Sequence, residues 1–185
     1  MDTIGLQTKI DHFGNVIGRM AGVENDAPAL VIGSHIDSQP YGGRYDGALG
    51  VIGALEVLES LYEQGITPNI PIVVIAFADE EGSRFNKGLF GVRGMLDLLE
   101  EGELERQDKT GMTRRKALIE FGCDPSKFEE CLIDTSKIAA FLELHIEQGP
   151  VLEAKEEPIG IVTGLWMTVE MEGPGSVPMA MILFI

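Results

Sequence analysis

Short apolar runs between polar turns define the elements that the sequence predicts. Residues 29–32 and 71–78 are almost continuously apolar, which is typical of strands covered on both faces. Residues 4–11 and 15–20 alternate more weakly, and the turn around Gly14 predicts that they form two successive strands. These runs together predict a sheet with buried central strands.

Helices are predicted between and after these strands. Residues 46–63 repeat apolar side chains at helical spacing, at Leu49, Ile52, Leu55, Leu58 and Leu61. Further helices are expected over residues 95–104, 113–121 and 124–131, as an excursion that covers one face of the sheet. Strands that alternate with helices indicate an α/β fold.

The last third of the chain predicts two more strands. The first is expected over residues 139–150, and three of its polar side chains alternate onto one face: Glu143, His145 and Glu147. A charged turn is expected over residues 153–157 and a final strand over residues 159–164. We expect one domain, with a boundary near Gly164.

Charge and composition exclude several classes of partner. The chain has 185 residues, 44% of them hydrophobic, and a formal net charge of −16. Such an acidic protein is a poor ligand for nucleic acid or an anionic membrane. The two cysteines form neither a disulfide framework nor a metal-binding spacing, and no signal peptide or membrane-spanning run is seen. A cytoplasmic location is therefore expected.

Chemically active side chains follow the first buried strand. His35 and Asp37 come just after residues 29–32, and Asp46 begins the predicted helix. Ligands bind at such carboxyl ends in α/β sheets. His35 can bind a metal while a carboxylate holds its other ring nitrogen, and the two oxygens of Asp46 can face two ions. The alternative is a hydrogen-bonded strand-end histidine and a simple helix cap.

Two further segments favour a metal site over these alternatives. Asp79, Glu80 and Glu81 follow the second buried strand, where three acids are costly unless a positive charge is near. One could bind a metal and the next a water; the alternative is a solvated acidic turn. His145, between two glutamates, suits either a metal ligand or a structural hydrogen-bond network.

Together the three segments suggest a hydrolase. Nitrogen and oxygen ligands without thiolates suit zinc, manganese or cobalt. Two ions that share Asp46 would lower the pKa of a bridging water and polarise a carbonyl. The spare glutamate would carry the proton from that water to a leaving nitrogen. This arrangement is suited to hydrolysis of amide-like bonds.

Three segments, residues 33–50, 79–85 and 143–153, resemble the family of N-carbamoyl-L-amino-acid hydrolases, β-ureidopropionases and allantoate amidohydrolases. That family belongs to the dinuclear zinc aminoacylases and carboxypeptidases. The first two segments identify only the larger group, whereas Glu-Leu-His-Ile-Glu-Gln-Gly-Pro at residues 143–150 points to the carbamoylase branch. The resemblance implies metal-dependent cleavage of a carbamoyl or ureido C–N bond in a small-molecule substrate.

The resemblance also implies a fold and a set of metal ligands. The fold would be a zinc-peptidase-like mixed sheet flanked by helices, with a lid domain that forms a homodimer. His35, Asp46 and His145 would hold one divalent ion, and Asp46 would bridge to a second ion bound by Glu81. The metals would be zinc or manganese, with cobalt as a further option.

Three more roles follow from the same resemblance. Glu80 would be the general base, Asp37 would orient His35, and Gln148 would touch the substrate.

The chain departs from the family pattern in its second half. Its only other histidine is His12, so the distant histidine of the second metal site has no candidate. We expect residues 1–164 to be an incomplete catalytic domain and residues 165–185 a remnant of the lid, which is otherwise absent. Weak or absent activity and self-association are expected. The alternatives to a ureido hydrolase are an impaired fragment that binds one metal or a partner chain, and a broader aminoacylase or peptidase.

Overall fold

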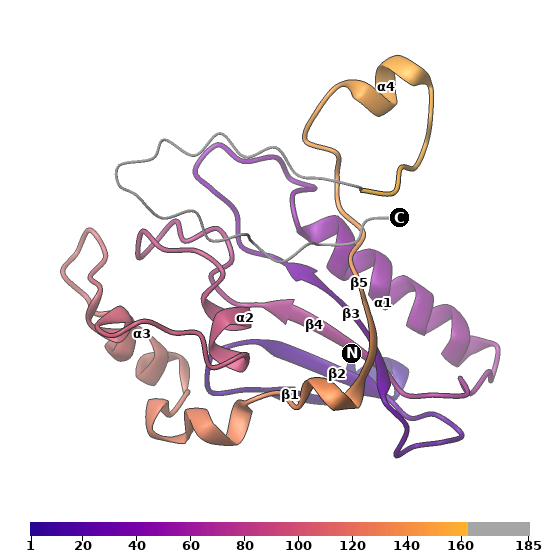
Figure 1. Ribbon diagram of the computed structural model, residues 1–185, viewed down its shortest axis with the longest axis horizontal. Helices are drawn as coiled ribbons and strands as arrows, with labels where there is room; N and C mark the ends of the chain where they lie inside the picture. Colours follow the sequence, from indigo (N-terminus) through magenta and orange to yellow (C-terminus); the bar gives the residue numbers. More distant parts are fainter. Residues whose placement is uncertain (163–185) are drawn as a thin grey trace.

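The computed structural model describes residues 1–162, which fold around one five-stranded mixed sheet (Figure 1). The spatial order of the strands is β1-β2-β4-β3-β5. Strand β2 is antiparallel to both of its neighbours, while β4, β3 and β5 run parallel. The strands are β1 (Gln7–Ile10), β2 (Val16–Met20), β3 (Ala29–His35), β4 (Ile72–Phe77) and β5 (Ile138–Leu142). The predicted α/β class with a mixed sheet flanked by helices is confirmed.

The register of the two central strands determines where the polar segments meet. In the parallel pair, His35 of β3 lies opposite Phe77 of β4. Both strands therefore end at the same edge of the sheet, and the segments that follow them start side by side. The loop after β3 and the Asp79–Glu81 turn after β4 are neighbours for this reason.

One face of the sheet is covered by helix α1 (Ala48–Glu63). Leu58 of this helix is fully buried against apolar side chains of β3 and β4, including Ile32 and Val74. The short 3-10 helix η1 (Asp2–Ile4) adds Ile4 to the same cluster.

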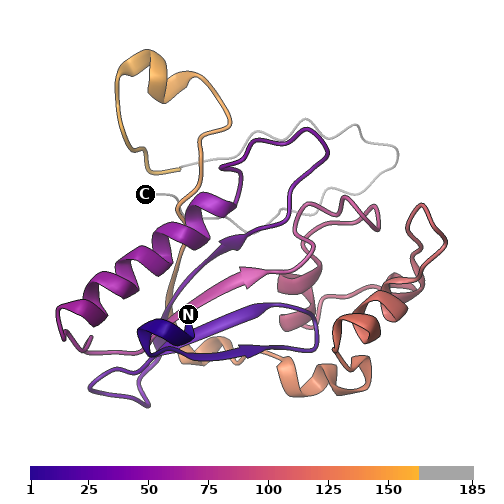
Figure 2. The ribbon, with the colours of Figure 1, turned by 180° about the vertical axis from the view of Figure 1, so that it is seen from behind.

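The opposite face is covered by the segment between β4 and β5 (Figure 2). Its elements are η2 (Glu103–Glu105), η3 (Pro125–Cys131) and η4 (Thr135–Lys137), which are 3-10 helices, with α2 (Phe90–Met95) and α3 (Arg114–Phe121). Phe90, Met95 and Leu118 from this segment pack against Val31 and Ile75 of the sheet. The expected helical excursion over one face is therefore present.

Two of the predicted helices and turns differ from the structure. The helix expected over residues 95–104 is wrong: α2 ends at Met95, and Asp97 adopts a left-handed backbone with φ 58°, which turns the chain away. The charged turn expected over residues 153–157 is mostly helix α4 (Val151–Lys155).

The two late strands are also corrected. The strand expected over residues 139–150 stops at Leu142, so His145 and Glu147 lie in a loop rather than on a strand face. Residues 159–162 form no strand, and the remainder of that prediction, with the expected lid remnant at 165–185, lies outside the described residues. Among residues 1–162, no helix combines the length and the apolarity needed to cross a membrane.

Candidate metal centre

His35 is the last residue of β3 and is almost fully buried, at 3% exposure. Its Nδ1 lies 2.8 Å from the backbone oxygen of Asp37. A carbonyl oxygen only accepts hydrogen bonds, so this contact assigns the proton to Nδ1 and leaves a lone pair on Nε2. The Asp37 carboxylate is farther from Nδ1, at 3.6 Å. The ring is thus held by the backbone of Asp37, with Nε2 available as a ligand atom.

His145 repeats this arrangement from the loop after β5. Its Nδ1 lies 2.9 Å from the backbone oxygen of Ile146, so its Nε2 also carries a lone pair. This Nε2 accepts a hydrogen bond of 3.3 Å from the backbone N–H of Gly47 and lies 3.1 Å from Oδ1 of Asp46. Two histidines, one at the end of β3 and one in the loop after β5, therefore present the same ring atom to one place.

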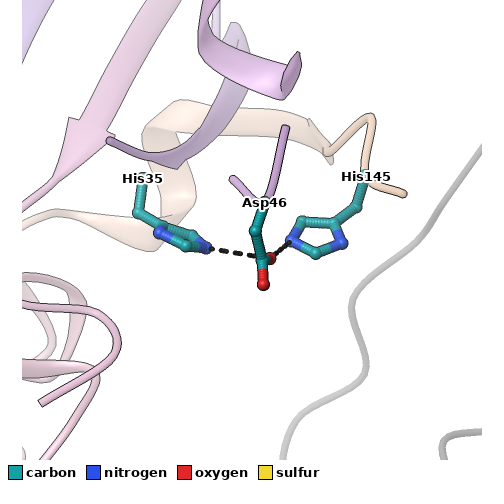
Figure 3. Close-up of side chains that lie close together, drawn as sticks. All are labelled: His35, Asp46 and His145. Atoms are coloured by element: carbon teal, nitrogen blue, oxygen red, sulfur yellow. Dashed lines mark ion pairs between the residues drawn. The ribbon is translucent and has the colours of Figure 1, made fainter. Parts of the chain in front are cut away.

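Asp46 lies between the two rings, just before α1 (Figure 3). Its Oδ1 is 3.9 Å from Nε2 of His35, and a ligand atom of each of the three residues lies within 4.8 Å of those of the other two. Two imidazole nitrogens and a carboxylate oxygen brought this close together favour the binding of a cation between them. Imidazole and carboxylate donors suit a first-row divalent ion. The donor set therefore fits a metal.

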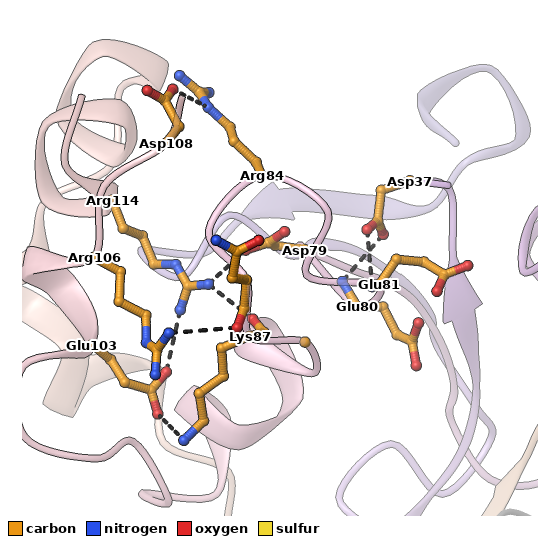
Figure 4. A network of polar contacts seen from close by, with 12 residues as sticks. Asp37, Asp79, Glu80, Glu81, Arg84, Lys87, Glu103, Arg106, Asp108 and Arg114 are labelled. Atoms are coloured by element: carbon orange, nitrogen blue, oxygen red, sulfur yellow. Dashed lines mark hydrogen bonds and ion pairs between the residues drawn. The ribbon is translucent and has the colours of Figure 1, made fainter. Parts of the chain in front are cut away.

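A second group of possible ligands is formed by His35 with Glu80 and Glu81. Oε2 of Glu80 lies 3.6 Å from Nε2 of His35. The backbone N–H groups of Glu80 and Glu81 donate to the Asp37 carboxylate at 3.2 and 3.1 Å (Figure 4). Burial raises the pKa of the Glu80 carboxyl, and the neighbouring Glu81 carboxylate adds to this rise. Asp37 thus joins the loop after β3 to the turn after β4.

Two glutamine side chains complete the open side of the site. Nε2 of Gln148 donates to Oδ2 of Asp46 at 3.0 Å, and Nε2 of Gln39 donates to Oε2 of Glu81 at 2.9 Å. Both line a cavity of about 330 Å³ that also contains Tyr41. Gln39 was not expected in the site from the sequence, although it lies between Asp37 and Asp46 in the chain.

Some polar side chains of the same segments have other functions. The Glu147 carboxylate accepts two backbone N–H groups at the start of α4, which explains why this residue is not part of the site. Glu143 is buried behind the histidines, and that burial raises the pKa of its carboxyl. Nδ1 of His12 accepts from the backbone of Asp124, in the excursion.

A mixed sheet whose carboxyl edge gathers two imidazoles and three carboxylates defines an α/β protein with a candidate metal site. Residues 31–181 match the sequence pattern of Peptidase family M20/M25/M40. The chain belongs to this metal-dependent family.

Named relatives and solved structures agree with this assignment. The chain is 41% identical over 191 residues to the N-carbamoyl-L-amino-acid amidohydrolase of Pseudomonas sp. (strain NS671), covering 98% of this chain and 46% of the relative. It is 37% identical over 166 residues to the allantoate amidohydrolase of Bacillus subtilis, covering 89% and 40%. A hydantoinase/carbamoylase family amidase from Burkholderia ambifaria superposes with a TM-score of 0.79 at 38% identity, covering 88% and 39%. The chain thus spans less than half the length of these relatives.

Proposed function

We propose that this protein hydrolyses a carbamoyl or ureido C–N bond, as in N-carbamoyl amino acids or allantoate. The observation that carries the proposal is the convergence of His35, Asp46 and His145 at the sheet edge where Glu80 and Glu81 also lie. The names of the N-carbamoyl-L-amino-acid and allantoate amidohydrolases, at 41% and 37% identity, support the substrate class.

In this proposal His35, Asp46 and His145 hold one divalent ion, and Asp46 and Glu81 hold a second. Both histidines are already oriented by backbone carbonyls, so their Nε2 atoms need no rearrangement to act as ligands. Zinc or manganese fits these nitrogen and oxygen donors. Such an ion lowers the pKa of a bound water and polarises a carbonyl group.

Glu80 is the proposed proton carrier. Its carboxylate faces the same side as Nε2 of His35, at 3.6 Å, and its backbone is held by Asp37. A carboxylate so placed can take a proton at Oε2 from the attacking water and give it to the leaving nitrogen. Gln148 is the proposed substrate contact, because its amide lies at the cavity wall beside Asp46. Asp37 orients His35 and the Glu80–Glu81 backbone at once.

The broader assignments belong to the same proposal. Residues 1–164 are proposed as part of the catalytic domain, and residues 165–185 as a remnant of the start of the lid domain, with self-association of the chain as part of the same proposal. A cytoplasmic location is supported by the free thiols of Cys123 and Cys131.

Metal content tests the ligand set. After dialysis against zinc or manganese, the His35→Ala variant should lose metal, while His12→Ala, a histidine outside the site, should keep it. Full metal content in His35→Ala would contradict the assignment.

Turnover tests the reaction. With N-carbamoyl amino acids and allantoate as substrates, Glu80→Gln should abolish turnover and retain metal, whereas Glu81→Gln should lose one ion. Equal turnover in wild type and Glu80→Gln would remove Glu80 from the reaction. Because weak or absent activity is expected of this chain alone, hydrolysis of either substrate by the metal-loaded wild type above the metal-free rate supports the proposal. Hydrolysis of N-acyl amino acids or peptides, with none of N-carbamoyl amino acids or allantoate, would contradict it.

A further inference from the structure

We propose that Arg114, in the excursion, is a positioning residue for the metal centre. Arg114 binds Asp79 and thereby fixes the position of the Glu80 and Glu81 carboxylates, which follow Asp79 in the same turn. The inference rests on the proposed function, because it concerns ligands of the second ion.

Arg114 is the first residue of α3 and one of the most buried side chains, at 1% exposure. Its guanidinium donates to Oδ2 of Asp79 at 2.8 Å and to the backbone oxygen of Lys87 at 2.9 Å (Figure 4). A third hydrogen bond, of 3.2 Å, reaches the buried Glu103 carboxylate. The guanidinium also lies over the ring of Phe90, 4.2 Å from its centroid. One buried cation therefore joins the turn after β4, the loop that follows it, and η2.

The turn that carries Glu80 and Glu81 is held from two sides. On the site side, the Asp37 carboxylate accepts the backbone N–H groups of both glutamates. On the far side, Arg114 binds the carboxylate of Asp79, the residue directly before them. Asp79 has a positive φ of 49°, which is uncommon for a non-glycine residue, although aspartate adopts it more readily than most, and which a restraint on the side chain helps to hold. The ion pair with Arg114 is such a restraint.

An arginine is suited to this task for geometric reasons. Its planar guanidinium offers five donors in a fixed arrangement, so it can bind Asp79, Lys87 and Glu103 at the same time. A lysine ammonium in the same place would keep the charge but would not span the three acceptors. Replacement by lysine therefore separates the charge of Arg114 from its bridging geometry.

The expected effect is selective for one ion. Partners that orient metal ligands typically affect metal affinity by about 10–100-fold when they are removed. Asp79→Asn leaves the contact between Arg114 and Glu103 in place and removes only the charged link to the turn. Asp79→Asn should lower the affinity for the ion that depends on Glu81 by about 10–100-fold. The ion that depends on His145 should bind as in the wild type.

The experiment is a calorimetric titration of the metal-free chain with Mn²⁺. Circular dichroism at the same temperature verifies that each variant is folded. Asp79→Asn and Arg114→Lys are compared with Glu81→Gln, which identifies the second ion. The control is Arg115→Gln, the next residue along α3, whose guanidinium pairs with Glu105 on the surface. Arg115→Gln should bind both ions as the wild type does.

Selective loss of the Glu81-dependent ion in both folded variants supports the positioning role. Equal weakening of both ions, or wild-type binding in Asp79→Asn and Arg114→Lys, overturns it, as does a titration in which Glu81→Gln loses no ion. A wild-type chain that binds no metal at all contradicts the proposed function instead, so the two failures are distinguishable.

Discussion

Gly47 allows the sharpest test of the metal centre, because a single methyl group there meets the ring of His35. Gly47 precedes α1 with φ 66° and ψ −46°. A Cβ built on it would lie 2.3 Å from Nε2 of His35, where ordinary van der Waals contact begins at 3.4 Å. The ring would have to move by about 1.1 Å, the difference between these two distances. It is buried and held through Nδ1 by the backbone of Asp37, so it cannot move without breaking that hydrogen bond.

Two separate costs follow from Gly47→Ala. A non-glycine residue at this backbone conformation costs about 1–3 kcal/mol of stability. Displacement of the ring removes a hydrogen bond worth about 1 kcal/mol net and withdraws Nε2 from the donor set. Displacement of the His35 ring should lower metal affinity by about 10–100-fold or more, since loss of contacts that orient a ligand has effects in that range.

Gly65→Ala is the matched control. Gly65 has φ 64°, and a Cβ there would meet no atom within 4 Å, so this variant carries only the backbone cost. We expect thermal unfolding to show destabilisation in both variants and zinc titration to show weak binding in Gly47→Ala alone. Equal zinc affinity in Gly47→Ala and Gly65→Ala would refute the reasoning.

Two further predictions concern stability. Burial raises the pKa of Glu103, but hydrogen bonds and charge from Arg93, with the Glu100 backbone and Lys87, outweigh it and lower that pKa from 4.5 to about 2. The stabilisation is present above pH 4.5 and is lost as the pH falls toward 2, about 3 kcal/mol in all; urea unfolding across this range should show a larger loss in wild type than in Glu103→Gln, where other carboxyls of lowered pKa such as Asp108 still titrate, and equal losses would contradict the prediction. Leu58→Ala, at a fully buried position, should cost about 2–5 kcal/mol in urea unfolding. The exposed Ile52→Ala should stay within about 0.5 kcal/mol, and a similar loss in both would contradict the core assignment.

The elements whose evidence is local could be predicted from the sequence. Residues 29–32 and 71–78 correspond to β3 and β4, and residues 46–63 to α1, because apolar periodicity reflects which faces are buried. The family and the candidate ligands were also accessible from motifs, since these residue types and spacings are specific.

Tertiary structure decided how those residues are held. The backbone carbonyls of Asp37 and Ile146 bind Nδ1 of His35 and His145, which leaves Nε2 of each ring as the ligand atom. The conformation of the loops, and not the residue type, places these carbonyls. The sequence predicts too long a strand before His145, because the alternation of polar residues does not reveal that Glu147 instead accepts hydrogen bonds from the start of α4. The link from Arg114 to Asp79 spans 35 positions and depends on the excursion packing against the sheet, so no local pattern contains it.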